Sequence, residues 1–332
     1  MRRPAAQRGR GMTTTSSPVR VAVLGCGAIG SLYAAHLARV DGVEVWGVDP
    51  WTEHVEAISA RGLRVVGAAE FVARVHAVTD ARHLPSCEFA IVATKSAHTR
   101  AAVEAARGAI ASAAAVSVQN GIGNEEAIAE VVPFVIRGSI VPAGAVPEPG
   151  VVRFDAPGES WFGPFEPSPA PAGSIARLAE LLTQGGLPTH ALDDARGPQW
   201  TKVVFNAATS PLSALTGLTV GQVCTDPALR HEVDGLIAEA LAVCDVAGIT
   251  LTRSPHESVE EAIREAYWHK PSMLQDVLAG RRSEVDVLNC GIAAEGQRVG
   301  VPTPRHDLMV ALVRGLELAR SGNASSAPEE TA

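Results

Sequence analysis

The sequence predicts an α/β protein in which a doubly wound parallel sheet is followed by an all-helical region. Two observations support this fold class. Short apolar runs alternate with helical stretches up to about Leu192, and after Asp193-Asp194 the strand-like runs stop while helical apolar spacing continues to Arg320. A length of 332 residues also exceeds the usual size of a single domain.

The first strand and helix are joined by a glycine pattern. The apolar run from Val21 to Leu24 leads into Gly25-Cys26-Gly27-Ala28-Ile29-Gly30 and then into an alanine-rich helical stretch. In such a turn the first glycine permits the tight bend, the second lets the backbone approach a pyrophosphate, and the third lets the helix pack on the sheet. The N–H groups at the helix start then bind the phosphates. This unit predicts a Rossmann-like dinucleotide-binding domain, although ordinary strand-to-helix turns also contain glycines.

Asp49 follows the second expected strand, which spans residues 43–48. At this place a carboxylate accepts hydrogen bonds from the ribose hydroxyls and repels a 2′-phosphate. No Lys or Arg occurs between Val40 and Ala60. The sequence therefore favours NAD(H) over NADP(H), and the alternative is that Asp49-Pro50 is only a turn.

The remaining elements follow from the same periodicities. Residues 88–94 and 115–119 read as strands and residues 99–110 as a helix, while the short β-prone pieces 151–154 and 160–162 read as hairpin strands added to the sheet edge. One more helix and strand close this part near Leu192. Helices are expected over residues 199–208, 226–248, 259–268, 283–300 and 305–320. The ligand cleft should then lie between the two parts, beyond the carboxyl ends of the strands.

The two ends of the chain are polar. We expect a disordered extension over residues 1–19, an NAD(P)-binding Rossmann domain over 20–193, an all-helical substrate and catalytic domain over 194–321, and a disordered tail over 322–332. The extension is basic but lacks the apolar core of a signal peptide, and Met12 is an alternative start.

Composition narrows the partners. A net charge of −8 offers no basic surface for nucleic acid, and no apolar run approaches the length of a membrane span. The five cysteines form no metal-spaced pairs, which indicates structural thiols in a reducing cytoplasm and no metal site. The expected partner is a small molecule. The oligomeric state stays open, with a homodimer as one option.

Lys202 and Asn206 are the residues whose spacing first suggests chemistry. They lie four apart on an expected helix and so share one face. A partly desolvated lysine can donate a proton to a developing alkoxide. Glu284, expected on a separate helix, could pair with Lys202 or accept a hydrogen bond from the new hydroxyl. By spacing alone, Lys202 and Glu284 could be solvated surface residues, and Asn206 could only make a hydrogen bond on the helix face.

Several motifs resemble the ketopantoate reductase (2-dehydropantoate 2-reductase) family. They are Gly25-Cys26-Gly27-Ala28-Ile29-Gly30, Thr94-Lys95, Gln119-Asn120-Gly121, the run from Trp200 to Asn206, and the run from Pro271 to Asp286. These motifs occur in family order over about residues 19 to 320. The resemblance implies NAD(P)H-dependent reduction of the ketone of a 2-oxo acid, namely ketopantoate to pantoate in pantothenate biosynthesis.

The resemblance also implies roles for individual residues. Lys202 would be the general acid, Glu284 would orient the hydroxyl and contact the cofactor, and Asn206 would position the carbonyl. Asn120 would lie between the nicotinamide and the substrate. The predicted cofactor-binding residues are thus Gly25, Cys26, Gly27, Ala28, Ile29, Gly30, Asp49, Lys95, Asn120 and Glu284.

Two of the implied residues have an alternative interpretation. Ser272 would help to bind the acid group of the substrate, but it could also be a helix N-cap with Gln275 at the third helical position. Lys95 could approach the cofactor or the substrate acid, or it could be an exposed loop lysine.

Three positions depart from the family pattern. Ser210 stands where the family usually has a substrate-binding Asn, His269 replaces a second Asn, and Val220 occupies a third such position. We count Ser210 and His269 among the candidate substrate-binding residues. The departures support an alternative function, a reductase or dehydrogenase of the same family that acts on a different 2-oxo or hydroxy acid with NAD(H). A non-catalytic NAD-binding protein is a third option, but it would not need Lys202 and Glu284 together.

Overall fold

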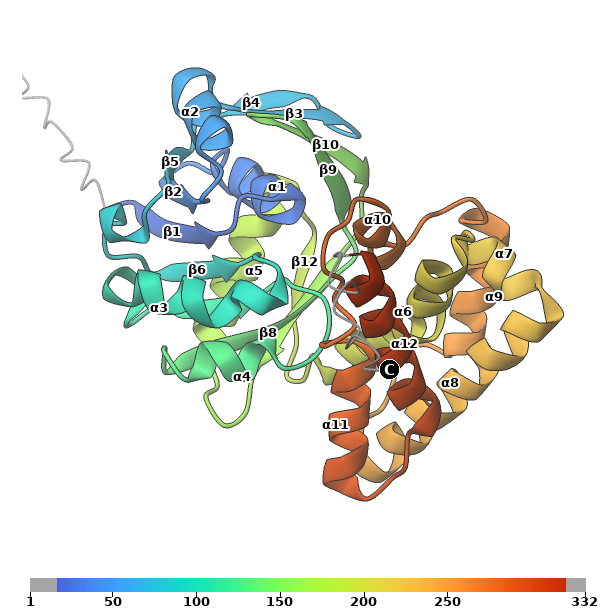
Figure 1. Ribbon diagram of the computed structural model, residues 1–332. Helices are drawn as coiled ribbons and strands as arrows, with labels where there is room; N and C mark the ends of the chain where they lie inside the picture. Colours follow the sequence, from blue (N-terminus) through green and yellow to red (C-terminus); the bar gives the residue numbers. More distant parts are fainter. Residues whose placement is uncertain (1–16, 321–332) are drawn as a thin grey trace, which may run out of the picture.

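The computed structural model describes residues 17–320, which form a sheet part and a helical part side by side (Figure 1). The main sheet has eight strands in the order β12-β11-β8-β7-β6-β1-β2-β5. Neighbouring strands are parallel except for β11, which runs antiparallel to β8. The strands are β1 (Val19–Leu24), β2 (Val43–Val48), β5 (His76–Val78), β6 (Phe89–Val92), β7 (Ala114–Ser117), β8 (Phe134–Ile140), β11 (Ser160–Pro164) and β12 (Thr189–Ala191).

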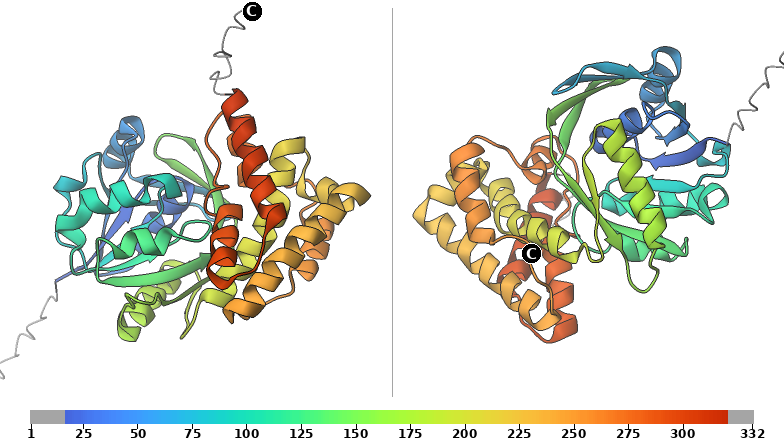
Figure 2. Two further views of the ribbon diagram at one scale, coloured as in Figure 1. Left: turned by 60° about the horizontal axis from the view of Figure 1, so that its bottom comes forward. Right: turned by 180° about the vertical axis from the view of Figure 1, so that it is seen from behind.

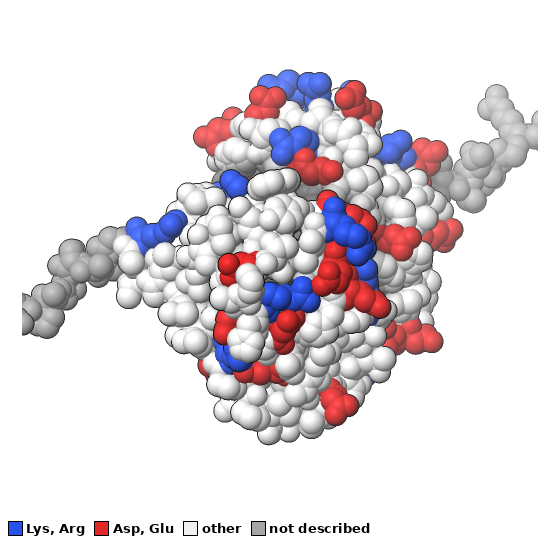
Figure 3. All heavy atoms as spheres, turned by 90° about the vertical axis from the view of Figure 1, so that its right-hand side faces the viewer, with Lys and Arg blue, Asp and Glu red and all other residues white. Residues whose placement is uncertain are grey.

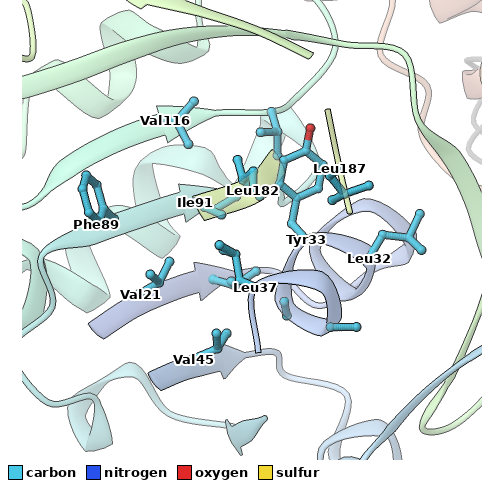
Figure 4. Close-up of a cluster of buried hydrophobic side chains, with 14 of the residues drawn as sticks. Val21, Leu32, Tyr33, Leu37, Val45, Phe89, Ile91, Val116, Leu182 and Leu187 are labelled. Carbon is cyan, nitrogen blue, oxygen red and sulfur yellow. The ribbon is translucent and has the colours of Figure 1, made fainter. Parts of the chain in front are cut away.

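Helices cover both faces of this sheet, which makes it doubly wound (Figure 2). They are α1 (Ala28–Leu37), α2 (Thr52–Arg61), α3 (Thr99–Ile110), α4 (Asn124–Ala129) and α5 (Ala172–Gly185), with single 3₁₀ turns at Ala81–His83 and Ser96–His98. Successive residues of a strand face opposite sides. Accordingly Val21 and Val23 of β1 pack under α1 and α5, whereas Ala22 and Leu24 pack under α3 and α4. The first of these two cores, with Tyr33 at its centre, is shown in Figure 4.

A second, four-stranded sheet corrects one expectation. It has the order β4-β3-β10-β9 and comprises β3 (Leu63–Gly67), β4 (Phe71–Ala73), β9 (Ala143–Glu148) and β10 (Val151–Ala156). Of the two predicted hairpin strands, only β11 joins the main sheet, and the expectation was wrong for β10. Val152 and Phe154 of β10 are buried in the core against α1. The strand therefore belongs to the second sheet, which covers α1, and not to the main sheet.

The helical part surrounds one long helix. Its elements are α6 (Arg196–Thr216), α7 (Val220–Thr225), α8 (Pro227–Ala247), α9 (Pro255–Glu265), α10 (Ser272–Leu278), α11 (Asn289–Val299) and α12 (Pro304–Arg320). Helix α6 packs against α7, α8, α9, α10 and α12. The predicted α/β fold class with a helical C-terminal part is confirmed. The helix expected over residues 283–300 begins only at Asn289, because Glu284 to Leu288 form hydrogen-bonded turns.

Pro211 lies inside α6 and leaves a carbonyl group without its usual helical partner. Proline has no N–H, so the Ala207 carbonyl four residues earlier needs another donor. The buried Asn289 side chain supplies it at 2.8 Å. Asn289 also donates to Nδ1 of His306, at 3.2 Å, while Nε2 of His306 donates to the Leu236 carbonyl at 3.0 Å. A buried polar chain therefore joins α6, α11, α12 and α8.

Both signs of charge are mixed on the outer face of the helical part (Figure 3). Arg230 of α8, for example, pairs with Asp234 and Glu260 at 2.9 and 3.0 Å. Within residues 17–320, no helix has the length and apolar character needed to cross a membrane. In the same range no cluster of three His, Cys, Asp or Glu side chains could hold a metal ion.

The ends of the chain bear on the predicted boundaries. Val19, which the prediction assigns to the extension, is the first residue of β1. The extension up to residue 16, the alternative start at Met12 and the tail over 322–332 lie outside the described residues.

Candidate active site

The glycine turn connects β1 to α1 and is shaped to hold a phosphate. Gly25 has a φ of +90°, and a Cβ on Gly30 would lie 1.8 Å from the Gly25 carbonyl oxygen, so the fold itself requires both glycines. A Cβ on Gly27 would instead meet nothing within 4 Å, so this position faces open space in front of α1. Helix α1 starts at Ala28 without a side-chain cap or an acidic residue in its first turn. Its free N–H groups therefore fit a pyrophosphate.

Asp49 lies directly beside this turn. Its Oδ2 accepts a hydrogen bond from the Cys26 N–H at 2.7 Å, and its Oδ1 accepts one from the Trp51 N–H at 2.9 Å. A carboxylate has about four lone-pair directions, so acceptor capacity remains for ribose hydroxyls. The structure thus places Asp49 against Cys26, next to the space that Gly27 leaves open.

A buried chain of hydrogen bonds from His54 through Ser31 to Cys26 lies behind the glycine turn and was not predicted from the sequence. Nδ1 of His54 accepts from the Gly150 N–H at 3.1 Å, so its Nε2 is the donor toward Ser31 Oγ at 3.3 Å. Ser31 Oγ donates in turn to the Cys26 carbonyl at 2.7 Å. The Cys26 residue is therefore held on its N–H by Asp49 and on its carbonyl by Ser31. The position of Ser31, one residue after Gly30, was the only sequence signal.

A cavity opens where α6 meets the carboxyl ends of β7 and β8. It is lined by Gln119, Asn120, Gly121, Gly138, Ser139, Ile140, Gln199, Lys202, Val203 and Asn206. Lys202 and Asn206 reach it from one face of α6, and Asn120 comes from the loop after β7. The structure therefore brings Asn120 together with Lys202 and Asn206, which the sequence proposed as a pair.

Lys202 is half-buried and lines this cavity, and its Nζ donates to the Ile140 carbonyl at 2.7 Å. Burial lowers the pKa of Lys202 to about 8, and the negative charge of Glu284 opposes this effect in part. An ammonium group with such a pKa loses its proton more readily than an exposed lysine. Lys202 is thereby suited to donate a proton near neutral pH.

Glu284 lies in the turn between α10 and α11, not on a helix as expected, because its carbonyl accepts the Val287 and Leu288 N–H groups, both at 3.2 Å. Its carboxylate accepts from Asn120 Nδ2 at 3.2 Å and from Ser96 Oγ at 3.5 Å. Only 10% of its side chain is exposed. Glu284 therefore links the helical part to the loops after β6 and β7.

Lys95 follows β6 and reaches the helical part. Its Nζ lies 2.7 Å from Asp276 Oδ2 and 3.7 Å from Glu284 Oε2, while 47% of its side chain is exposed. Asp276 is 4% exposed and also pairs with Arg281 at 2.9 Å. Sequence reasoning missed Asp276, although it lies one helical turn after Ser272 on α10.

The other three candidate residues do not line the cavity of Lys202. Ser210 is buried on α6, and His269 and Ser272 are exposed. The His269 carbonyl accepts from the Val220 N–H at 3.0 Å. Two of the positions that depart from the family pattern are therefore joined by a backbone hydrogen bond. Ser272 is the first residue of α10. The cap position falls on Pro271 without a side-chain cap bond, so the N-cap interpretation was off by one residue.

The fold and the site define a class of protein, a two-part oxidoreductase that uses a nicotinamide dinucleotide. Residues 21–167 match the sequence profile described as "Ketopantoate reductase PanE/ApbA", and residues 194–317 match the profile "Ketopantoate reductase PanE/ApbA C terminal". The chain belongs to the ketopantoate reductase family. The predictions of family and enzyme class are confirmed.

Individual relatives agree with this family. The 2-dehydropantoate 2-reductase of Mesorhizobium japonicum is 30% identical over 326 residues, which cover 91% of this chain and 99% of that protein. The crystal structure of a PanE/ApbA family ketopantoate reductase from Ralstonia eutropha JMP134 superimposes with a TM-score of 0.83 at 29% identity, covering 91% of this chain and 100% of the other. A complex of D-mandelate dehydrogenase with NADH has a TM-score of 0.79 at 25% identity, covering 91% and 99%.

Proposed function

We propose that this protein reduces the ketone of a 2-oxo acid to a hydroxyl group with NADH, and that Lys202 is the general acid. The observation that carries the proposal is the position of Lys202. Its Nζ shares a cavity with Asn120 and Asn206 at the edge of the sheet that carries the glycine turn. Relatives named 2-dehydropantoate 2-reductase make ketopantoate the first substrate to test.

The residues that would hold the cofactor lie along the carboxyl edge of the sheet. The N–H groups of Gly27, Ala28 and Ile29 would bind the pyrophosphate, while Cys26, whose N–H donates to Asp49, would shape the turn beside it. Asp49 would bind the adenosine ribose. Asn120, Lys95 and Glu284 would lie near the nicotinamide. When bound, the cofactor supplies a hydride to the ketone carbon.

The side chains of the cavity would then handle the proton. As the ketone oxygen gains negative charge, Lys202 Nζ donates a proton to it, which gives the hydroxyl group and a neutral amine. Asn206 and Asn120 would donate hydrogen bonds that orient the carbonyl. Glu284 would accept from the new hydroxyl, and its negative charge keeps Lys202 protonated before the reaction.

Two features support NADH as the cofactor. The Asp49 carboxylate is fixed at the glycine turn by Cys26, and a 2′-phosphate placed there would be repelled. One of the similar structures, that of D-mandelate dehydrogenase, is a complex with NADH. The preference for NAD(H) over NADP(H) is thus part of the proposal.

A second candidate function is reduction or oxidation of another 2-oxo or hydroxy acid. It is favoured by Ser210, a small buried residue on α6, and by the exposed His269, both at positions where the resemblance implies Asn. The similarity to D-mandelate dehydrogenase supports it as well.

Steady-state consumption of NADH with a panel of 2-oxo acids, ketopantoate included, separates these functions. A clear preference for ketopantoate supports the first function, and a preference for another acid supports the second. Binding of NADH without turnover of any 2-oxo acid, with NADH or with NADPH, would instead support a non-catalytic NAD-binding protein.

We also propose the cytoplasm as the location and a domain boundary near residues 193 and 194. All five cysteines are free thiols, as in a reducing compartment. The second family profile begins at residue 194. A homodimer stays a prediction, and light scattering of the purified chain would test it.

A further inference from the structure

Three polar side chains meet at the cavity of Lys202, the buried Gln199 and Glu125 and the half-buried Arg137. Gln199 of α6 accepts a hydrogen bond at its Oε1 from Arg137 Nη1 at 2.5 Å. Its Nε2 donates to Glu125 Oε1 of α4 at 2.7 Å and to the Gly121 carbonyl at 3.3 Å. Gln199 and Glu125 are 4% and 1% exposed. The amide of Gln199 is therefore held from both ends, which fixes its orientation.

Each of these three residues is next to a group of the cavity. Gln199 precedes Lys202 by one turn of α6. Arg137 lies on β8, three residues before Ile140, whose carbonyl accepts from Lys202. Glu125 is in the first turn of α4, just after the loop that carries Asn120. Gln199 thus ties together the three chain segments that form the walls of the cavity.

The charges in this cluster are costly to bury. Burial raises the pKa of Glu125 to about 7, an effect opposed by Arg137 and strengthened by the neighbouring Glu126. Asp194 and Glu295 also face Arg137, and its guanidinium lies 5.2 Å from the centre of the Phe165 ring. Apolar side chains could pack α6 on the sheet without such a cost, but they would not specify one register. The hydrogen bonds of Gln199 to Arg137 and Glu125 are directional and favour a single position of the helix, while Arg137 Nε has no hydrogen-bond partner within residues 17–320.

We propose that Glu125, Gln199 and Arg137 are positioning residues that clamp the first turn of α6 onto the sheet part and thereby fix Lys202 at the Ile140 carbonyl. The inference rests on the proposed function of Lys202 as the acid. Misplacement of a catalytic group by about 1 Å can cost about 100-fold in rate. The glycine turn lies on β1, away from the clamp, whereas Gln199 also holds the loop of Asn120. We therefore expect the clamp to affect turnover more than NADH binding.

Glu125 is the best residue for the test because it does not line the cavity. E125L removes the Glu125 acceptor of Gln199 and leaves only the more distant Gly121 carbonyl, whereas E125Q keeps an amide oxygen at the same place. We expect kcat to fall by about 10-fold or more in E125L and to return to within about 3-fold of wild type in E125Q. The dissociation constant of NADH, from fluorescence titration, should change less than about 2-fold in both. E126L is the matched control, since Glu126 is exposed on the same helix.

A readout without substrate separates the clamp from the proposed reaction. The chain has three lysines, Lys95, Lys202 and Lys270, so ¹³Cε-lysine labelling gives a spectrum in which Lys202 can be titrated. In E125L the pKa of Lys202 should rise from about 8 toward that of a free lysine, because a displaced α6 admits water. In E125Q and E126L it should stay as in wild type.

Wild-type kcat and an unchanged Lys202 titration in E125L would overturn the proposal. Equal losses of kcat, NADH affinity and melting temperature would overturn it too, since they indicate general destabilisation. If no 2-oxo acid is reduced by the wild-type protein, the proposed function fails, and the Lys202 titration still decides the clamp.

Discussion

The Asp49 carboxylate accepts the Cys26 N–H at 2.7 Å, and this bond ties the end of β2 to the glycine turn. The bond holds a negative charge beside the open space left by Gly27. Because the N–H of Cys26 is already engaged, the turn is preorganised before a dinucleotide arrives. The same residue therefore shapes the turn and sets the charge that the adenosine ribose would meet.

The first prediction concerns cofactor choice. Catalytic efficiency with NADH should exceed that with NADPH, and D49N should narrow the gap, because Asn keeps an acceptor for Cys26 but removes the charge that repels a 2′-phosphate. Steady-state kinetics with both cofactors measure this, with D41N as a control in the exposed turn before β2. A wild-type preference for NADPH of about 10-fold or more, which is about 1.4 kcal/mol of the wrong sign, would refute the assignment.

The second prediction tests Lys202 as the acid. K202A should lower kcat by about 100-fold or more with NADH affinity nearly unchanged. Reduction needs the protonated amine, so kcat should fall as pH rises through the Lys202 pKa of about 8. K270A at an exposed lysine is the control. Collapse of NADH binding with turnover preserved at saturation would instead make Lys202 a cofactor ligand.

The elements that the sequence predicted well depend on local patterns. The glycine turn was predictable because the conformation of Gly25 and the close contact of Gly30 arise within a single strand-helix unit. Lys202 and Asn206 were predictable as a pair because four residues make about one helical turn. The second sheet was not predicted because β10 pairs with β3, a strand far earlier in the chain. The spacing of apolar residues predicts a strand but does not indicate its partner.

The environment of Glu284 illustrates the same limit within the site. Its partners Lys95, Ser96 and Asn120 come from two loops of the sheet part, more than 160 positions away. The family motifs indicated these residues singly, but their contacts depend on how the helical part packs on the sheet. The hydrogen bonds of His54 could not be predicted either, since they depend on the Gly150 N–H from the turn before β10.

The third prediction concerns the ion pair between Lys95 and Asp276, which bridges the two parts at 2.7 Å. Lys95 is about half exposed, so solvent screens the pair, and a double-mutant cycle with K95M and D276N should give a coupling of about 0.5 to 1 kcal/mol in the free energy of unfolding. The coupling should decrease at high salt. Additive effects of the two substitutions would show that the contact contributes nothing to stability.

The fourth prediction concerns pH and stability. Burial lowers the pKa of His306 from 6.5 to about 4, although the Leu236 carbonyl and Asp307 oppose the shift. Between these values the unfolded chain binds a proton that the folded chain does not, so falling pH favours unfolding. The difference between the two pKa values corresponds to roughly 3 kcal/mol of unfolding free energy, which is lost as the pH falls from 6.5 to 4. Chemical unfolding at several pH values measures this. In H306Q the free energy of unfolding should no longer show this decrease, whereas H231Q, at an exposed histidine, should keep it.

The last prediction concerns the substrate and tests whether it contacts Ser210 and His269, which do not line the cavity of Lys202. A site built to hydrogen-bond a hydroxyl group rejects analogues that lack it, whereas a site without those groups discriminates weakly. The resemblance implies Asn at both positions, so we expect ketopantoate to be reduced but not clearly better than a bulkier or less polar 2-oxo acid. S210N combined with H269N should improve kcat/KM for ketopantoate selectively.

The two single variants show which position acts. Ser210 is 4% exposed, so S210N must fit a larger side chain into a packed helix face, and its melting temperature has to be compared with wild type. His269 is exposed and tolerates substitution more easily. If the wild-type enzyme already prefers ketopantoate over every analogue by about 1,000-fold, which is about 4 kcal/mol of transition-state discrimination, Ser210 and His269 are neutral replacements. In that case the substrate hydroxyl must be bound by other side chains, and Asn206 and Asn120, which share the cavity of Lys202, are the next residues to substitute.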